Sequence, residues 1–141
     1  MTTYGATRGR RCEHNLVYWH DQRYLAFGPG ASGYWGDTRY TTVLGPDDYI
    51  RRVKQGEPTI ADIELVDAEQ ERSEVMMLGL RLNEGVSQQE FARRFGVGME
   101  SVFGPEIQRL TSVGLLETAD GHLRLTQRGR LLGNEAFAAF I

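Results

Sequence analysis

Leu115-Leu116-Glu117-Thr118-Ala119-Asp120-Gly121-His122-Leu123-Arg124-Leu125 is the stretch that predicts a β-hairpin. Apolar residues flank an Asp-Gly pair, which is favoured in two-residue hairpin turns because both positions take a positive φ. The hairpin follows three predicted helices and precedes a fourth. Residues 67–141 are therefore expected to form a helical, winged-helix-like domain.

Start and stop signals define the helices of this domain. The three predicted helices before the hairpin span about 68–83, 88–95 and 99–113. Ser87 and Glu90 form the capping box that starts the second helix. Gly104-Pro105 predicts a late start or a kink in the third, because proline has no N–H to donate. Thr126 is expected to cap the closing helix. The residues expected to face inward from that helix are Leu131, Leu132, Phe137 and Phe140.

The first 56 residues have a different character and are rich in aromatic and β-branched residues. Two strands are predicted over 23–28 and 34–43. A short helix over 47–55 follows, and its inner face is expected to carry Tyr49, Ile50 and Val53. Residues 57–66 are predicted to be a linker. The expected fold class is α+β, with a short strand-rich N-terminal segment over 1–56 followed by the winged-helix-like domain.

The motif His14-Asn15-Leu16-Val17-Tyr18-Trp19 carries the candidate ligand-binding residues. His14 and Tyr18 share a face whether the segment is a helix or a strand, and both imidazole and tyrosinate bind haem iron. Trp19 can stack on a flat macrocycle. Cys12 is a further candidate metal ligand, because the neighbouring arginines favour its thiolate. The alternatives are a buried His-Asn-Tyr hydrogen-bond cluster that supports the glycine loop, and an incidental thiol at Cys12.

Four segments together resemble the radical-SAM oxygen-independent coproporphyrinogen III oxidases, and most closely their HemW-type haem-chaperone branch. These segments are HNxxYW at 14–19, GPGAxG at 28–33, MLGLR at 77–81 and LTxxGxLLxN at 125–134. Because these segments are spread from residue 14 to residue 134, the resemblance extends over nearly the whole chain. The family's core carries a CxxxCxxC cluster motif, whereas this chain has one cysteine. The resemblance is therefore to the C-terminal third of such a protein.

The resemblance implies an accessory part that helps to bind haem or another tetrapyrrole, with His14 as the candidate iron ligand. The strand-rich segment would be the remnant of a partial barrel. Gly28 and Gly30 would then lie near the S-adenosylmethionine site of the complete protein, whose radical-SAM core is the expected partner. With Cys12 as the single thiol, no iron–sulfur cluster is expected in this chain, which should be inactive alone. A structural or protein-interaction module without a ligand is the alternative.

Composition restricts the partners further. Residues 1–56 hold eight Lys/Arg against five Asp/Glu, or +3, and residues 57–141 hold eight against fourteen, or −6. An acidic winged helix cannot neutralise phosphates, so a DNA-binding regulator is disfavoured and no nucleic acid is expected. The single thiol and the lack of a long apolar run predict a cytoplasmic chain without a membrane span. The strands at 23–28 and 34–43 would leave an open edge, which predicts a homodimer.

Overall fold

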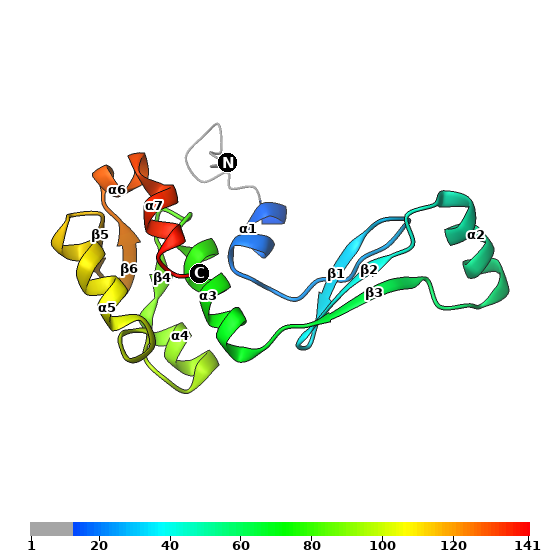
Figure 1. The fold of residues 1–141 in the computed structure, drawn as a ribbon, viewed down its shortest axis with the longest axis horizontal. Coiled ribbons are helices and arrows are strands. Elements are labelled where there is room, and N and C mark those ends of the chain that lie inside the picture. Colours follow the sequence, from blue (N-terminus) through cyan, green and yellow to red (C-terminus); the bar gives the residue numbers. More distant parts are fainter. Residues whose placement is uncertain (1–12) are drawn as a thin grey trace. The chain divides into compact units, whose positions relative to one another are not determined.

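The computed structural model describes residues 13–141, which divide into two units (Figure 1). One unit comprises 13–21 together with 68–141, and the other comprises 22–67. Cys12 lies outside the described residues. The architecture is mixed α and β, and the described residues contain two three-stranded sheets. Below, 22–67 is called the strand unit and the other the helical unit.

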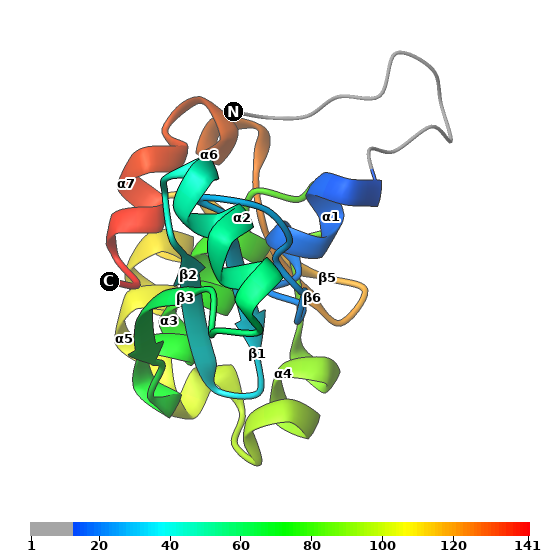
Figure 2. The same ribbon diagram turned by 90° about the vertical axis from the view of Figure 1, so that its right-hand side faces the viewer.

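The strand unit is built on an antiparallel sheet of order β1-β2-β3. Its strands are β1 (Ser32–Trp35), β2 (Thr38–Thr42) and β3 (Ile60–Leu65). Figure 2 shows this unit from the side of its helix. Thr38 pairs with both Trp35 and Leu65, which sets the register across all three strands. Ala61, Ile63 and Leu65 alternate with polar residues, which is a strand pattern, so the linker predicted for 57–66 is wrong over β3.

The segment 23–28 does not form the predicted strand. Only Tyr24 is paired, in an isolated bridge with Tyr34. Farther along, side chains take the place of a neighbouring strand: the N–H of Ala26 donates to the Tyr40 hydroxyl at 3.0 Å, and that of Gly28 donates to the Tyr49 hydroxyl at 3.1 Å. These tertiary bonds satisfy the backbone without a ladder.

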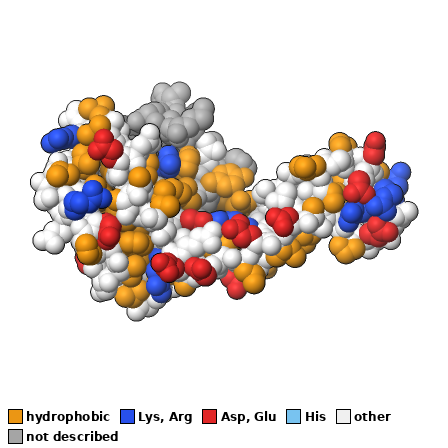
Figure 3. All heavy atoms as spheres, in the orientation of Figure 1, with side chains coloured by type: hydrophobic (Ala, Val, Ile, Leu, Met, Phe, Trp, Pro, Cys, Tyr) orange, Lys and Arg blue, Asp and Glu red, His pale blue; other side chains and the backbone are white. Residues whose placement is uncertain are grey.

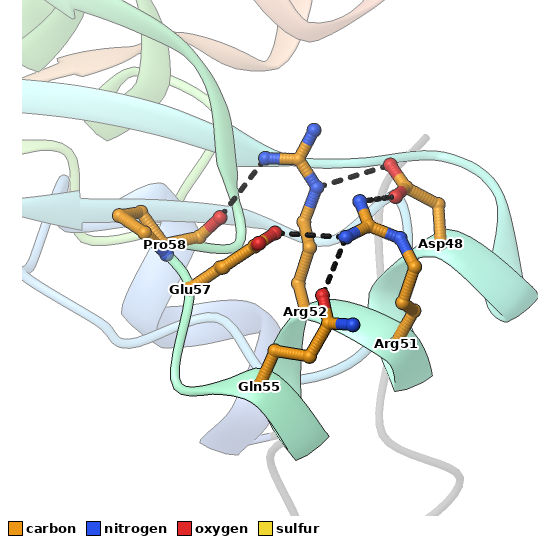
Figure 4. Close-up of polar contacts among 6 residues, drawn as sticks. All are labelled: Asp48, Arg51, Arg52, Gln55, Glu57 and Pro58. Atoms are coloured by element: carbon orange, nitrogen blue, oxygen red, sulfur yellow. Dashed lines mark hydrogen bonds and ion pairs between the residues drawn. The ribbon is translucent and has the colours of Figure 1, made fainter.

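The helix of the strand unit is α2 (Pro46–Gln55), close to its predicted bounds. Arg51 bridges Asp48 at 2.6 Å and Glu57 at 2.9 Å, which ties the helix to the segment that follows it (Figure 4). The expectation that its apolar residues face inward is wrong for two of them. Ile50 is 49% exposed and Val53 is 56% exposed, because nothing in this unit covers that side of α2.

The helical unit contains the remaining elements. They are α1 (Glu13–Trp19), α3 (Ala68–Gly79), β4 (Val86–Ser87), α4 (Gln88–Phe95), α5 (Met99–Ser112), β5 (Leu116–Ala119), β6 (His122–Leu125), α6 (Gln127–Leu131) and α7 (Gly133–Ala138). Its sheet has the order β4-β6-β5. Buried side chains from every layer close one core, among them Met76, Phe91, Leu110, Leu123 and Phe140. Burying such side chains stabilises the fold by about 1.5–3 kcal/mol each.

Most local signals in this unit are confirmed. Asp120 and Gly121 form the hairpin turn with φ of 53° and 73°. The Ser87 side chain accepts from the N–H of Glu90 at 3.2 Å, so the capping bond exists. Helix α5 is kinked at Phe103, two residues before Pro105.

The closing helix is the exception in the helical unit. It breaks at Leu132 into α6 and α7. Leu131 is 84% exposed rather than inward-facing, whereas Phe140 is 2% exposed as expected. The break changes the helical phase, so spacing from one half does not carry over to the other.

Among the described residues, no helix combines the length and the apolar character that crossing a bilayer requires.

Candidate functional site

The motif at 14–19 forms most of helix α1. Position 14 and Tyr18 are one turn apart, as a shared face requires. Tyr18 is 38% exposed and so remains accessible. Trp19 lies about 100° farther round the helix, on a different face from Tyr18. The stacking role expected for Trp19 would therefore use a different side of α1 from the donor role expected for Tyr18.

The end of α1 is fixed by an ion-pair network. The carboxylate of Asp21 is buried and accepts from the Arg94 guanidinium at 2.9 Å. The same guanidinium contacts the backbone carbonyl of Asp21 at 3.3 Å and the carboxylate of Glu71. Arg94 on α4 and Glu71 on α3 thus hold the residue that follows α1. The motif is anchored to the core by charge as well as by packing.

A pocket of about 300 Å³ lies beside this anchor. Trp19 and His20 line it from the end of α1, and Glu84, His122 and Phe91 line it from the rest of the unit. The Nε2 of His20 is 3.9 Å from a carboxylate oxygen of Glu84. The Nδ1 of His122 is 2.9 Å from the carbonyl oxygen of Asp120.

Neither His20 nor His122 is among the candidate residues that the sequence pointed to. No spacing signal could have joined His20 to His122, because the link is made by tertiary folding. Within residues 13–141, no group of three or more His, Cys, Asp or Glu side chains is placed to hold a metal ion. A haem iron needs only one or two axial side chains, so such a group is not required for haem.

Arg81, from the MLGLR segment, lies over the ring of Trp19. Its guanidinium carbon is 5.6 Å from the centre of the Trp19 ring and 4.3 Å from that of Phe137. A guanidinium over an aromatic face is attracted by the ring quadrupole. The motif and the MLGLR segment, which the sequence keeps far apart, therefore meet in one place.

The glycine loop belongs to the strand unit and uses its amides internally. The N–H of Gly30 donates to the carbonyl of Val43 at 2.9 Å, and the N–H of Gly28 donates to Tyr49. The buried Thr42 hydroxyl donates to the Gly28 carbonyl at 2.6 Å and accepts from the N–H of Ala31 at 2.9 Å. These bonds favour a structural role for Gly28 and Gly30 over a cradle for an anion.

Residues 66–132, which contain α3 through α6, match the HemN C-terminal domain. The chain is 37% identical over 136 residues to the heme chaperone HemW of Bacillus subtilis, covering 96% of this chain and 36% of that protein. It is 32% identical over 133 residues to the heme chaperone HemW of Lactococcus lactis, covering 94% and 35%. The chain belongs to the HemN/HemW-like family. It spans about a third of the length of these relatives.

The fold is that of a HemN structure as well. The solved coproporphyrinogen III oxidase (HemN) from Escherichia coli, described as a radical SAM enzyme, matches 85% of this chain with a TM-score of 0.65. The match covers 28% of that protein at 16% identity, so it supports the fold alone. The family assignment made from the HNxxYW and MLGLR segments is confirmed.

Proposed function

We propose that this chain is the C-terminal accessory part of a HemW-like radical-SAM protein and that helix α1 helps to hold haem or another tetrapyrrole. The observation that carries the proposal is the placement of the motif. It lies on a surface helix with Tyr18 accessible, and Trp19 contacts Arg81 at the edge of a pocket. The relatives' name, heme chaperone, supports the same ligand class.

In this proposal each residue of the motif has one role. His14 would supply a neutral imidazole to the iron, and the phenolic oxygen of Tyr18, one turn later, would be an alternative donor on that face. Trp19 offers apolar area at the rim, where one edge of a macrocycle can rest. Cys12 remains a weaker candidate ligand. Haem would supply an iron that can accept such a donor, and the chain would supply the donor and the apolar contact.

A haem titration tests the proposal, because the chain has three histidines that can be removed singly. His14→Ala should abolish most of the Soret shift, and Tyr18→Phe should weaken it. His20→Ala and His122→Ala are matched controls that should leave it unchanged. If His20→Ala or His122→Ala abolishes the shift and His14→Ala does not, the ligand lies in the pocket and the α1 proposal is wrong.

A second candidate function, a docking module, is favoured by the surface of the strand unit. Trp35, Ile63 and Leu65 fall on one face of the sheet by register and are 62%, 61% and 73% exposed. Figure 3 shows hydrophobic side chains along the surface of this unit. Exposed apolar clusters of this kind mark interaction surfaces. We infer that this face packs against the radical-SAM core, since the relatives are almost three times as long as this chain.

Docking can be tested with the remaining two thirds of the Bacillus subtilis protein as a separate chain. The two pieces should co-purify, and Ile63→Lys with Leu65→Lys should prevent it. Glu64→Lys is the matched control, because position 64 lies on the opposite face of the same strand. Equal loss of binding in both variants would show that charge, and not the apolar face, governs association.

We also propose that the helical unit is winged-helix-like and serves protein contacts rather than DNA. The order helix α3, strand β4, helices α4 and α5, then hairpin β5–β6 supports this topology. Helix α5, in the place of a recognition helix, carries Glu100 and Glu106 against Arg109. An acidic helix cannot supply phosphate contacts. Fluorescence anisotropy with duplex DNA at low salt should show no binding.

A further inference from the structure

We propose that Arg81 and Arg130 bind the carboxylate of an amphipathic ligand in a pocket of about 460 Å³ in the helical unit. The pocket is separate from the one beside His20. Arg81 lines it from the turn after α3, and Arg130 and Phe137 line it from α6 and α7. Neither the family match nor the names of the relatives assigns a ligand to it.

Arg81 is the residue that points to an anion. Its Nε is buried, and among the described residues it has no hydrogen-bond partner. Two aromatic rings, Phe137 at 4.3 Å and Trp19 at 5.6 Å, hold the guanidinium in place. Within residues 13–141 the structure gives Arg81 no ion pair, whereas Arg94 and Arg124 each contact a carboxylate. A buried N–H without an acceptor is costly, so this site is short of a negative partner.

The surroundings of Arg81 select the kind of anion. Arg130 adds a second positive charge and Glu135 a negative one, so the pocket has a net charge of about +1. One carboxylate neutralises that charge, and the planar guanidinium fork matches its two oxygens. A doubly charged phosphate would leave an excess negative charge beside Glu135.

The apolar residues that line the pocket determine what kind of molecule can carry the carboxylate. Leu131 lines the pocket and is 84% exposed, so its side chain is available to a ligand. Leu132, Phe137 and the buried Leu80 and Leu125 extend this apolar lining. Covering such area stabilises a bound ligand by about 25 cal/mol per Å² of apolar surface. The ligand class is therefore an aromatic or aliphatic body with a carboxylate at its edge.

The test uses 2-naphthoate as the probe and 2-naphthamide as its uncharged isostere, with amide NMR of the full chain as the readout. Naphthoate should shift the signals of residues 80–83 and 130–137, and naphthamide should not. Arg81→Gln should weaken naphthoate binding about tenfold, because a charge-assisted bond contributes at least that much. Arg81→Lys should recover part of the loss, since it keeps the charge without the fork.

Two exposed positions keep the test informative if Arg81→Gln unfolds the chain. Arg130→Gln should weaken binding several-fold, and Glu135→Gln should strengthen it by a similar factor, because it removes a like charge from beside the carboxylate. Equal shifts with naphthoate and naphthamide, or normal binding by both Arg81→Gln and Arg130→Gln, would overturn the proposal.

A carboxylate could come from a free organic acid or from a tetrapyrrole side chain. Haem and its dimethyl ester separate the two sources: if haem shifts residues 130–137 and the ester does not, the tetrapyrrole carboxylate uses this site. If neither shifts them while naphthoate does, the ligand is a free acid. His14→Ala should leave naphthoate binding unchanged, because His14 does not line this pocket. The carboxylate site can therefore be tested independently of the haem proposal.

Discussion

The guanidinium of Arg94 donates a 2.9 Å hydrogen bond to the carboxylate of Asp21, 73 positions earlier in the chain. The Asp21 side chain is 4% exposed and that of Arg94 is 29% exposed. A carboxylate removed from water to this extent needs a charged partner to remain ionised. The residue that ends the α1 segment is thus held by a helix that is distant in sequence.

Replacing that partner should be costly. Arg94→Ala leaves the carboxylate of Asp21 buried and without its guanidinium, so the free energy of unfolding should fall by about 2–4 kcal/mol. Urea denaturation measures the loss. Hydrogen exchange at residues 16–21 should accelerate more than exchange in β5 and β6. Arg93→Ala is the matched control, because among the described residues Arg93 makes no ion pair of the kind that Arg94 makes with Asp21, and its effect should stay within about 0.5 kcal/mol. Equal losses of unfolding free energy in the two variants would show that the ion pair between Arg94 and Asp21 does not stabilise the fold.

Gly129 should tolerate no side chain. A Cβ at this position would lie 2.0 Å from the carbonyl oxygen of Leu115, which is backbone and cannot move aside cheaply. Gly129→Ala should therefore lower the free energy of unfolding by at least about 2 kcal/mol. Gly104→Ala, where a Cβ meets nothing within 4 Å, should change it by less than about 1 kcal/mol. Thermal unfolding of the two variants side by side provides the measurement. Similar melting temperatures for the two variants would contradict the close approach of the Leu115 carbonyl oxygen to Gly129.

Asp48 should titrate below its ordinary value. The Arg51 guanidinium lowers the pKa of this carboxyl below 3.8, with a smaller contribution from Arg52. A lowered pKa in the folded state means that the stabilising contribution is complete above the unfolded value. It is lost as the pH falls through the lower, folded value. NMR titration of the Asp48 side chain should show the shift. Arg51→Gln should raise that pKa more than Arg52→Gln, and the opposite order would contradict the assignment.

Strand β3, rather than the segments 23–28 and 34–43, is the edge through which the chain is expected to dimerise. β2 is central in the sheet, and β1, the other edge, already pairs with Tyr24 at Tyr34, whereas every residue of β3 is exposed. The N–H of Val66 points inward to the Asp37 carbonyl, so by alternation that of Ile63 points outward. Ile63→Pro removes an outward donor without breaking the ladder and should give a monomer.

Sedimentation over a range of concentrations decides this point. The parent chain should show a concentration-dependent increase in mass, and Ile63→Val should behave like the parent. A single 15.9 kDa species at all concentrations would exclude association through β3.

Local chemistry made much of the helical unit predictable. The Asp-Gly turn, the Ser87 cap and the kink before Pro105 depend on residues within a few positions of one another. Such signals survive because no tertiary contact competes with them. The four family segments, HNxxYW and MLGLR among them, likewise carried the family assignment without any tertiary information.

Long-range partners made the rest unpredictable. β3 alternates apolar and polar residues, but it was mistaken for a linker because both faces of this edge strand are exposed, so no buried apolar face reinforces the pattern. The pocket beside His20 includes His122, which comes from the far side of the hairpin turn. Arg81 could be placed between Trp19 and Phe137 only by folding, since neither ring lies within a helical turn of it in the sequence.

The residues that match the family domain, 66–132, are fewer than the residues that fold together as the helical unit. A fragment cut at residues 66–132 would keep Arg94 and Glu71 but lose Asp21, and it would keep Arg81 without either of its rings. It would also lack Ala136 and Phe140 from the core. Transplanting this module into another protein therefore requires carrying the short helix from before the strand unit along with it.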